Sequence, residues 1–460
     1  MADPFLLAHH VAERVFNISG KLSPVSLKDQ VIRGRLFVDR AFEEGLITSA
    51  PDQGLLILGG GACGVTAAIR AAELGVPTVL LERSPRLFGL QAGCTTRWLD
   101  PAQYDWPLDH WMAATFPWAG APMPLSWSAD WAHALARWWR LGLQAAVAYF
   151  GPTMLNVEFN ASISTSAPFT YPMALPVINV NYTTSGGPQT KPFGAVLVTV
   201  GFGLENTTAP SSYRGFAFWE SDPFSNPNWG VPAGTAPRIL ISGAGDGALQ
   251  DFLRIMTGQK SAQDAFQKCG IPASIAANLK DIERRAASAL HWGRHAQHDH
   301  SLHMELEQEH QTQAAATLIQ PGVKAKLAAL LKGRPTSLKL VYKCEHLTPF
   351  YGLNRFLTLL IAEHLKQTAG VSVLEPQTSV SSVTGTTHVC AANPTLCHGE
   401  THWIVLDAWA DCRATTSSGS KATERHNVLI IRHGILPSAP AFHSLTPVAQ
   451  ARQVLPYYLV

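Results

Sequence analysis

A glycine-rich stretch between residues 54 and 83 constrains the fold of this chain more than any other feature. An apolar run, Leu55 to Leu58, predicts a short buried strand, and Gly59, Gly61 and Gly64 follow it in a G-x-G-x-x-G pattern. In such a pattern the first glycine permits a tight turn. The second lets a pyrophosphate approach the backbone, and the third lets a helix pack closely on the strand. Free amides at the start of that helix would face the phosphates. The stretch therefore predicts a dinucleotide site.

The residues after this turn complete a β-α-β unit. Residues 67–74 are predicted to be helical, residues 75–77 break the helix, and residues 78–81 form a second strand that ends at Glu82, with Arg83 beside it. Glu82 follows Gly61 by 21 residues, where a carboxylate can accept hydrogen bonds from a ribose diol. A carboxylate there repels a 2′-phosphate, so the site is expected to bind FAD or NAD rather than NADP. The alternative is a glycine-rich turn in some other α/β protein.

A second strand-turn-helix pattern begins at Arg238. The predicted strand, residues 238–242, runs into Gly243, Gly245 and Ala248, which match G-x-G-x-x-A and include Gly247. The next segment departs from the pattern, because residues 259–332 are predicted to be helical where a strand ending in an acid or an arginine is expected. Two interpretations stay open: this turn binds NAD(P)H, or it is a vestigial copy that supports the fold.

Composition narrows the class of protein. The chain has 460 residues, 46% of them hydrophobic, and a formal net charge of +2, so we expect two or three domains and no nucleic-acid partner. Its seven cysteines are scattered and form no C-x-x-C, which favours a reducing compartment. We see neither a signal peptide nor an apolar segment long enough to span a membrane. The expectation is a cytoplasmic protein.

A tryptophan-rich excursion occupies residues 90–150. It holds eight of the 13 tryptophans, namely Trp98, Trp106, Trp111, Trp118, Trp127, Trp131, Trp138 and Trp139. Its second part, residues 129–150, has a helical pattern with aromatic residues at helical spacing. We favour core packing for these rings. The alternatives are a wall against a flat cofactor or substrate, and a helix that docks on a partner or a membrane surface.

Two groups of residues resemble metal ligands, and neither is assigned to a metal. One is a run of six histidines within the helical segment, namely His291, His295, His298, His300, His303 and His310. Glutamines alternate with them, so a solvated helix face is the preferred interpretation. The other is Cys390, Cys397, His398 and His402, for which we favour a hairpin insert over a zinc site.

The order of motifs resembles the two-dinucleotide-binding-domain flavoproteins, which include the pyridine nucleotide–disulfide reductases and the flavin-containing and N-hydroxylating monooxygenases. The two fingerprints lie 184 residues apart, a strand ending in Thr199-Val200-Gly201 precedes the second, and a late strand runs into Gly434. The resemblance implies an α/β fold in which an FAD-binding Rossmann-like domain contains an inserted second dinucleotide-binding-like domain and helical inserts.

The implied boundaries follow from that order. Residues 1–53 form a helical preamble, with an amphipathic helix over 27–45, and residues 54–200 form the first part of the FAD domain. Residues 201–385 form the second domain with its helical insert, 259–332, and residues 386–460 return to the FAD domain.

The resemblance also implies roles for particular residues. The FAD-binding positions would be Gly59, Gly61, Gly64, Glu82 and Arg83, with Thr199 and Gly201 at the crossover and Gly434 near the flavin. The NAD(P)H-binding positions would be Gly243, Gly245, Gly247 and Ala248. Weaker candidates for an active site, from their place along the chain, are Cys94, Arg97, Asp105, Trp106, Pro107, His110, His346, Tyr351 and Asn354.

Two departures from the family shape the expected activity. The chain has no C-x-x-C or C-x4-C, so the dithiol relay of the disulfide reductases is absent. Trp219-Glu220-Ser221 replaces the His-Ser of the monooxygenase motif. We expect an NAD(P)H-dependent, monooxygenase-like FAD enzyme that acts on a small amine-bearing or aromatic molecule, with homo-oligomerisation left open. The alternatives are an FAD oxidase or dehydrogenase that its substrate reduces directly, and a flavin-binding scaffold.

Overall fold

The structure is a computed structural model. It describes residues 3–19, 26–118, 120, 122–164, 168–172, 176–201, 203–209, 213–222, 224, 237–292, 300–335, 337–347, 351–384, 402–410 and 416–434. Cys390, Cys397 and His398 lie outside these residues, as do His295 and His298. None of the described helices is long and apolar enough to cross a membrane.

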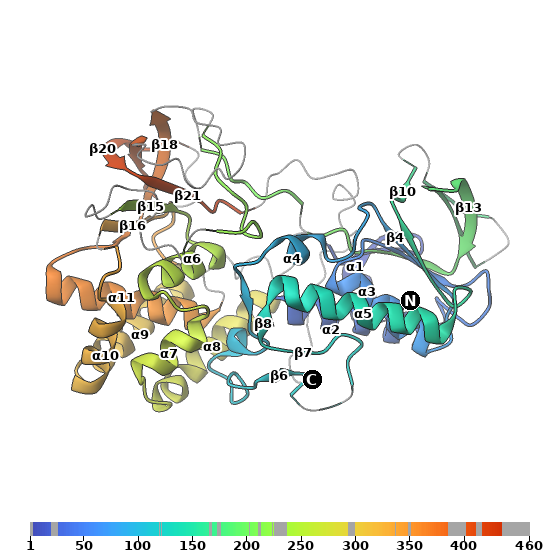
Figure 1. Ribbon diagram of the computed structural model, residues 1–460, viewed down its shortest axis with the longest axis horizontal. Coiled ribbons are helices and arrows are strands. Elements are labelled where there is room, and N and C mark those ends of the chain that lie inside the picture. The colour runs from blue at the N-terminus through green and yellow to red at the C-terminus, as the bar shows by residue number, and fades with distance from the viewer. Residues whose placement is uncertain are drawn as a thin grey trace.

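The first half of the chain is built on a six-stranded sheet (Figure 1). Its order is β1 (His10–Ala12), β2 (Val15–Asn17), β14 (Ala195–Val198), β3 (Leu55–Leu58), β4 (Thr78–Glu82) and β9 (Leu155–Phe159). All neighbours are parallel except β1 and β2. Residues of β3 and β14 are fully buried, as expected for parallel strands covered on both faces. Helices α2 (Leu27–Glu43) and α3 (Ala62–Glu73) pack in the same apolar core.

The N-terminal segment is less helical than the sequence predicts. The expected amphipathic helix is present as α2, with Ser26 and Asp29 forming a capping box, and α1 covers Pro4–His9. Strands β1 and β2, however, extend the sheet beyond β14. Three-residue strands are too short to show a period, and only the pairing of β1 with β2 and of β2 with β14 reveals them.

The second half contains a four-stranded parallel sheet. Its order is β17 (Leu374–Glu375), β16 (Ser337–Val341), β15 (Arg238–Ser242) and β21 (Val428–Ile431). Helices α6 (Asp246–Thr257) and α11 (Gly352–Ala369) share its core. The order β21-β15-β16-β17 repeats the order β14-β3-β4-β9 of the first sheet. The predicted α/β class, with two similar nucleotide-type units, is confirmed.

Each unit also carries an antiparallel sheet before its last parallel strand. In the first unit it consists of β10 (Ser162–Ile163), β11 (Phe169–Thr170), β12 (Ile178–Thr184) and β13 (Gly187–Phe193). In the second it consists of β18 (Thr378–Thr384), β19 (His402–Ala408) and β20 (Gly419–His426). His402 therefore lies at the start of a strand.

The C-terminal part of the described chain does not return to the first sheet, contrary to the expectation for residues 386–460. Strand β21 pairs with β15 from Ile239↔Val428 to Ser242↔Ile431. In the first sheet the corresponding edge of β14 is occupied by β2, so β21 completes the second sheet instead. Gly434 consequently follows a strand of the second unit, as Gly201 does in the first, and both have a left-handed φ, +79° and +82°.

The predicted helical insert is present between α6 and β16. It comprises α7 (Ala262–Cys269), α8 (Ser274–Trp292), α9 (His300–Leu318) and α10 (Pro321–Leu331). Helix α9 differs from the solvated helix expected, because Leu306, His310 and Ala314 are buried at four-residue spacing. The His310 imidazole contacts a carboxylate oxygen of Glu283 at 2.6 Å, and Arg355 pairs with the same carboxylate. Within the described residues no group of three or more His, Cys, Asp or Glu gathers as a metal site.

The tryptophan-rich excursion links the two halves of the chain. Its elements are α4 (Gly89–Gly93), β5 (Trp98–Leu99), the 3-10 turn η1 (Gln103–Asp105), β6 (Thr115–Phe116), β7 (Trp127–Ser128), β8 (Asp130–Trp131) and α5 (Ala132–Phe150). Trp127 and Trp139 are buried in the first core, whereas Trp106 and Trp111 are buried in the second. Burial supports core packing for these four rings, although Trp138 is 65% exposed.

Candidate functional site

The first glycine turn has the close contacts that the sequence predicts. Gly59 has a φ of +108°, and a Cβ there would lie 2.6 Å from the carbonyl oxygen of Thr199. A Cβ on Gly64 would lie 2.0 Å from the carbonyl oxygen of Gly59, so only glycine lets α3 approach β3 this closely. The Thr199 hydroxyl donates to the Leu58 and Gly59 carbonyl oxygens, each at 2.9 Å, and so ties β14 to the turn.

Gly61 differs from its neighbours because nothing in the protein requires it to be glycine. Its backbone angles, φ −84° and ψ −174°, suit any residue, and no atom lies within 4 Å of an added Cβ. It begins α3 without a side-chain cap, so the helix amides face open space. This is the geometry of an anion site at a helix N-terminus.

Glu82 lies at the same turn. One carboxylate oxygen accepts a hydrogen bond from the Gly60 amide and the other from the Ser84 amide, both at 2.7 Å. Each oxygen keeps a further lone pair, which can accept a ribose hydroxyl. Arg83 is the next residue and is exposed. The residues present therefore fit an adenine dinucleotide, with Gly61 and the α3 amides against the pyrophosphate and Glu82 against the ribose.

The second glycine turn repeats this geometry. Gly243 has a φ of +139°, and a Cβ there would lie 2.3 Å from the carbonyl oxygen of Arg432, the residue equivalent to Thr199. Gly245 has φ −74° and ψ 169°, begins α6 without a side-chain cap, and has no atom within 4 Å of an added Cβ. Ala248 is fully buried where α6 meets the sheet. Gly247 differs in role, because its added Cβ would lie 3.2 Å from the Phe218 ring.

An acidic residue marks the difference between the two turns. Asp246 opens α6, and its side chain accepts hydrogen bonds from Asn354 and Gln250. Burial, assisted by the nearby Asp251 carboxylate, raises the pKa of Asp246 to about 7. The candidates Tyr351 and Asn354 therefore lie at the second turn, where the Tyr351 ring packs 4.6 Å from Tyr104.

The structure also shows which residue stands where a ribose-binding acid would stand in the second unit. Strand β16 pairs with β15 so that Ser242 faces Val341, as Leu58 faces Leu81 in the first unit. Tyr342 thus occupies the place of Glu82, and Lys343 that of Arg83. The Lys343 ammonium lies 3.9 Å from the centre of the Trp409 ring. No carboxylate occupies this place to repel a 2′-phosphate. The sequence did not reveal that this strand carries the ribose position of the second unit, because the helical insert separates it from α6.

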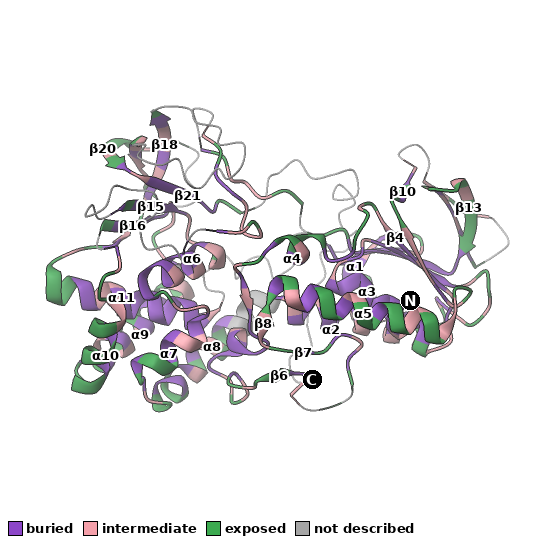
Figure 2. Ribbon diagram, viewed as in Figure 1, coloured by how far each residue is buried: buried purple, intermediate pink, exposed green. Residues whose placement is uncertain are grey.

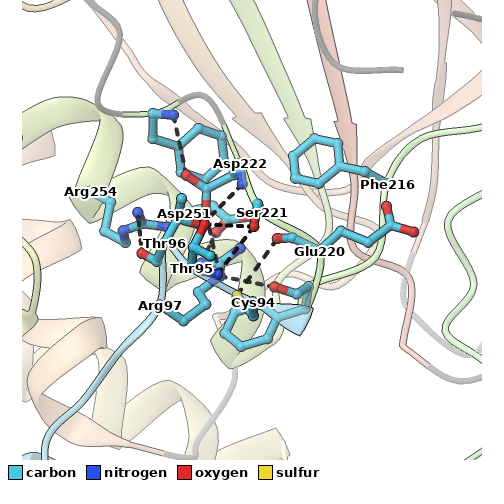
Figure 3. Close-up of polar contacts among 12 residues, drawn as sticks. Cys94, Thr95, Thr96, Arg97, Phe216, Glu220, Ser221, Asp222, Asp251 and Arg254 are labelled. Atoms are coloured by element: carbon cyan, nitrogen blue, oxygen red, sulfur yellow. Dashed lines mark hydrogen bonds and ion pairs between the residues drawn. The ribbon is translucent and has the colours of Figure 1, made fainter. Parts of the chain in front are cut away.

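A buried network of charges joins the two units beside the second turn (Figure 3). The Asp251 carboxylate on α6 contacts Arg97 Nη1 at 2.5 Å and Arg432 Nε at 2.8 Å. Arg97 also donates to the Phe218 carbonyl oxygen at 2.9 Å and lies 3.9 Å from the centre of that ring. Burial alone would raise the pKa of Asp251, but Arg432 and Arg97 outweigh it and the pKa is lowered. Arg97 therefore connects the excursion to the second unit.

A second carboxylate in this network is Asp222. It accepts hydrogen bonds from the Thr96 hydroxyl at 2.9 Å and from Arg254 at 2.5 Å. Cys94, at the edge of the network, is buried, and its sulfur lies 3.8 Å from the Glu220 carbonyl oxygen. Within the part of the chain that the structure describes, Cys94, Cys63 and Cys269 form no disulfide.

The remaining candidates lie elsewhere. His346 lies beside Glu307 of α9, whose hydrogen bond raises the histidine pKa. Asp105 pairs with Lys28 of α2 and lies 3.2 Å from His110, whose ring stacks on Trp118. Trp106 stacks on Phe356 of α11, and Pro107 follows it in a cis peptide. The structure therefore brings Arg97, Tyr351 and Asn354 to the second turn and leaves His346 and His110 outside it.

No protein-family model and no curated protein matches the chain. Comparison with solved structures returned matches at low sequence identity and low TM-score. A bacillithiol disulfide reductase from Staphylococcus aureus aligns at 11% identity and a TM-score of 0.40, over 84% of this chain and 77% of that chain. A thioredoxin reductase from Lactococcus lactis aligns at 10% identity and a TM-score of 0.36, over 85% and 81%. An ornithine N-hydroxylase from Kutzneria sp. 744 aligns at 10% identity and 0.34, over 84% and 81%.

At these values the likeness is no basis for a function, which must come from the chain's own residues.

Three features of the site gave no signal in the sequence. The network unites Arg97, Asp251 and Arg432, which are far apart along the chain, and Asp246 is unremarkable until its burial is known. The place of Tyr342 could be found only from strand pairing.

Proposed function

We propose that the chain is an FAD-dependent oxidoreductase in which the first glycine turn binds FAD and the second binds NAD(P)H. One observation carries the proposal: Gly61 and Gly245 have ordinary backbone angles and open space around them. Neither turn geometry nor packing explains a glycine at these two positions, whereas a pyrophosphate lying against the backbone does.

Bound FAD would supply the electron-transfer chemistry, and the protein would position it. Gly61 and the α3 amides would bind its pyrophosphate, and Glu82 would accept its ribose hydroxyls. At the second turn, Gly245 and the α6 amides would bind the nicotinamide nucleotide. Asn354 would orient Asp246 at the first position of α6.

Within this class we propose a monooxygenase-like activity on a small amine-bearing or aromatic molecule. The support is the absence of C-x-x-C and C-x4-C pairs from the whole sequence, which leaves no adjacent dithiol to accept electrons from reduced flavin. Oxygen is then the natural acceptor.

One feature favours a second candidate, an FAD oxidase or dehydrogenase with an idle second turn. Asp246 occupies the place of Ala62 in the first turn, and when charged it would repel a pyrophosphate. A substrate that reduces FAD directly would make the second turn a structural copy.

Paired glycine variants test the two assignments. Gly61→Val is expected to lose bound flavin. Gly245→Val is expected to keep flavin but to bind NADPH at least ~10-fold more weakly, because a tenfold change corresponds to about 1.4 kcal/mol and a clash between the valine side chain and a phosphate costs more than that. Gly322→Val is the matched control, because Gly322 also has open space around it but lies in α10. Retention of flavin by Gly61→Val would refute the first assignment, and unchanged NADPH binding by Gly245→Val the second.

A further inference from the structure

Helix α5 is apolar on two opposite faces. Leu135, Trp139 and Leu143 are buried in the first core. On the outer side Trp138 is 65% exposed, Leu141 is 46% exposed and Tyr149 is 84% exposed. Figure 2 shows buried and exposed residues alternating along α5. A surface helix of a globular protein normally has a polar outer face, so three large apolar side chains exposed on one helix imply that another surface covers them.

The charges on this helix have one sign. Residues 132–150 include Arg137 and Arg140 but no Asp or Glu. Arg137 is exposed, and Arg140 is half-buried with its Nε donating to the Ala136 carbonyl oxygen. The carboxylate that comes just before the helix, Asp130, accepts a hydrogen bond from the Trp131 amide. The outer face is therefore both apolar and basic.

A neighbouring element carries a further exposed apolar residue. Phe88, the residue before α4, places its ring 5.4 Å from that of Trp139. Leu90, two residues later, is 61% exposed. Helix α4 thus adds an exposed leucine beside α5.

We propose that the outer face of α5 docks on the surface of an anionic lipid bilayer. Tryptophan and tyrosine favour the membrane–water interface, where the ring is buried and the polar edge stays hydrated. Arginine is attracted to acidic headgroups. The proposal is independent of the assignments of FAD and NAD(P)H.

The size of the surface argues against a second copy of the chain as the occupant. A helix of 19 residues is about 28 Å long, and one face about 10 Å wide covers about 280 Å². A stable protein interface buries about 800 Å² on each partner. Two copies of α5 would also bring four arginines together without a carboxylate on either helix. A bilayer requires neither a large area nor a matching shape.

Co-sedimentation with vesicles tests the proposal on the intact protein. We expect binding to mixed phosphatidylcholine–phosphatidylserine vesicles, weaker binding to phosphatidylcholine alone, and loss of the difference at high salt, because salt screens the arginines. The double variant Trp138→Ser/Tyr149→Ser is expected to lose at least ~10-fold in partitioning, since two exposed aromatic rings would no longer be buried. Arg137→Gln is expected to lose about five-fold on the mixed vesicles only.

The matched control is Trp403→Ser, which removes a 51% exposed tryptophan from β19, outside this surface. Its binding should equal that of the wild type, and circular dichroism should show that every variant is folded. Absence of binding to either vesicle, or an equal loss in the control, would overturn the proposal. So would a dimer in sedimentation velocity that the double variant dissociates, because that result assigns the face to a second copy.

Discussion

The buried carboxylate of Asp251 should be the most sensitive single position in the network that joins the two units. It has no exposed surface and contacts Arg97 at 2.5 Å and Arg432 at 2.8 Å. Asp251→Asn keeps the size and one acceptor oxygen but removes the negative charge. Arg432 would then lose its buried ion pair with Asp251, whereas Arg97 would keep a second carboxylate, Asp222, at 3.5 Å. Each guanidinium group already has one buried nitrogen without a hydrogen-bond partner.

The expected cost follows from this geometry. Removing one partner of a buried ion pair costs about 3–5 kcal/mol, whereas an exposed pair contributes about 0–1 kcal/mol. We therefore expect Asp251→Asn to lower the free energy of unfolding in urea by about 3–5 kcal/mol. The control Asp281→Asn removes a carboxylate that is 88% exposed and pairs with Arg285, and it should change stability by less than about 0.5 kcal/mol.

The same variant should also affect function, because Arg97 belongs to the excursion and Asp251 to the second unit. Loosening this contact should slow the reduction of bound flavin by NADPH, measured by stopped-flow absorbance. A loss of less than about 1 kcal/mol in Asp251→Asn, no larger than that of the exposed control, would refute the claim that the buried arginines depend on the negative charge of Asp251.

Three further results are expected. The pKa of Asp246 is raised to about 7, so between about pH 4 and pH 7 the folded state holds a proton that the unfolded state has released. The free energy of unfolding should therefore fall by up to about 4 kcal/mol as the pH rises through this range. Asp246→Asn should flatten that slope in urea titrations and strengthen NADPH binding above pH 7 in fluorescence titrations; parallel slopes in both proteins would contradict this. Tyr342 and Lys343 predict that NADPH binds more tightly than NADH. Lys343→Gln should therefore lower the ratio of the NADH dissociation constant to the NADPH dissociation constant, and an unchanged ratio would disprove this role for Lys343. Thr199→Val should cost about 1–2 kcal/mol in thermal unfolding, because the Gly59 carbonyl oxygen loses the hydroxyl donor, while the Leu58 carbonyl oxygen keeps the Thr199 amide at 2.8 Å; a neutral effect would show that water replaces the hydroxyl.

The glycine turns could be predicted from the sequence because their signal is local. Gly59, Gly61 and Gly64 stand at fixed offsets between an apolar strand and a helix, and the structure gives Gly59 and Gly64 the expected close contacts and leaves open space at Gly61. The second turn follows the same rule at Gly243 and Gly245. Patterns of this kind depend on neighbours within a few residues, which sequence reasoning can see.

The errors arose where partners are distant along the chain. Strands β1 and β2 have three residues each; β1 is defined by pairing with β2, and β2 joins the sheet by pairing with β14, 181 residues away. Strand β21 pairs with β15 of the second sheet, and in the first sheet the edge of β14 pairs with β2. Neither pairing can be read from residues that are close in the sequence. His310 looked like part of a solvated histidine run until its pairing with Glu283 was known.

Anaerobic titration of the purified protein with NADPH tests the central claim most directly. The account predicts a yellow protein whose flavin absorbance is bleached by one equivalent of NADPH and returns when oxygen is admitted. In Gly245→Val the flavin should remain bound but should not be bleached at that concentration. A colourless protein would contradict the first site, and a bound flavin that stays oxidised with both NADPH and NADH would contradict the second.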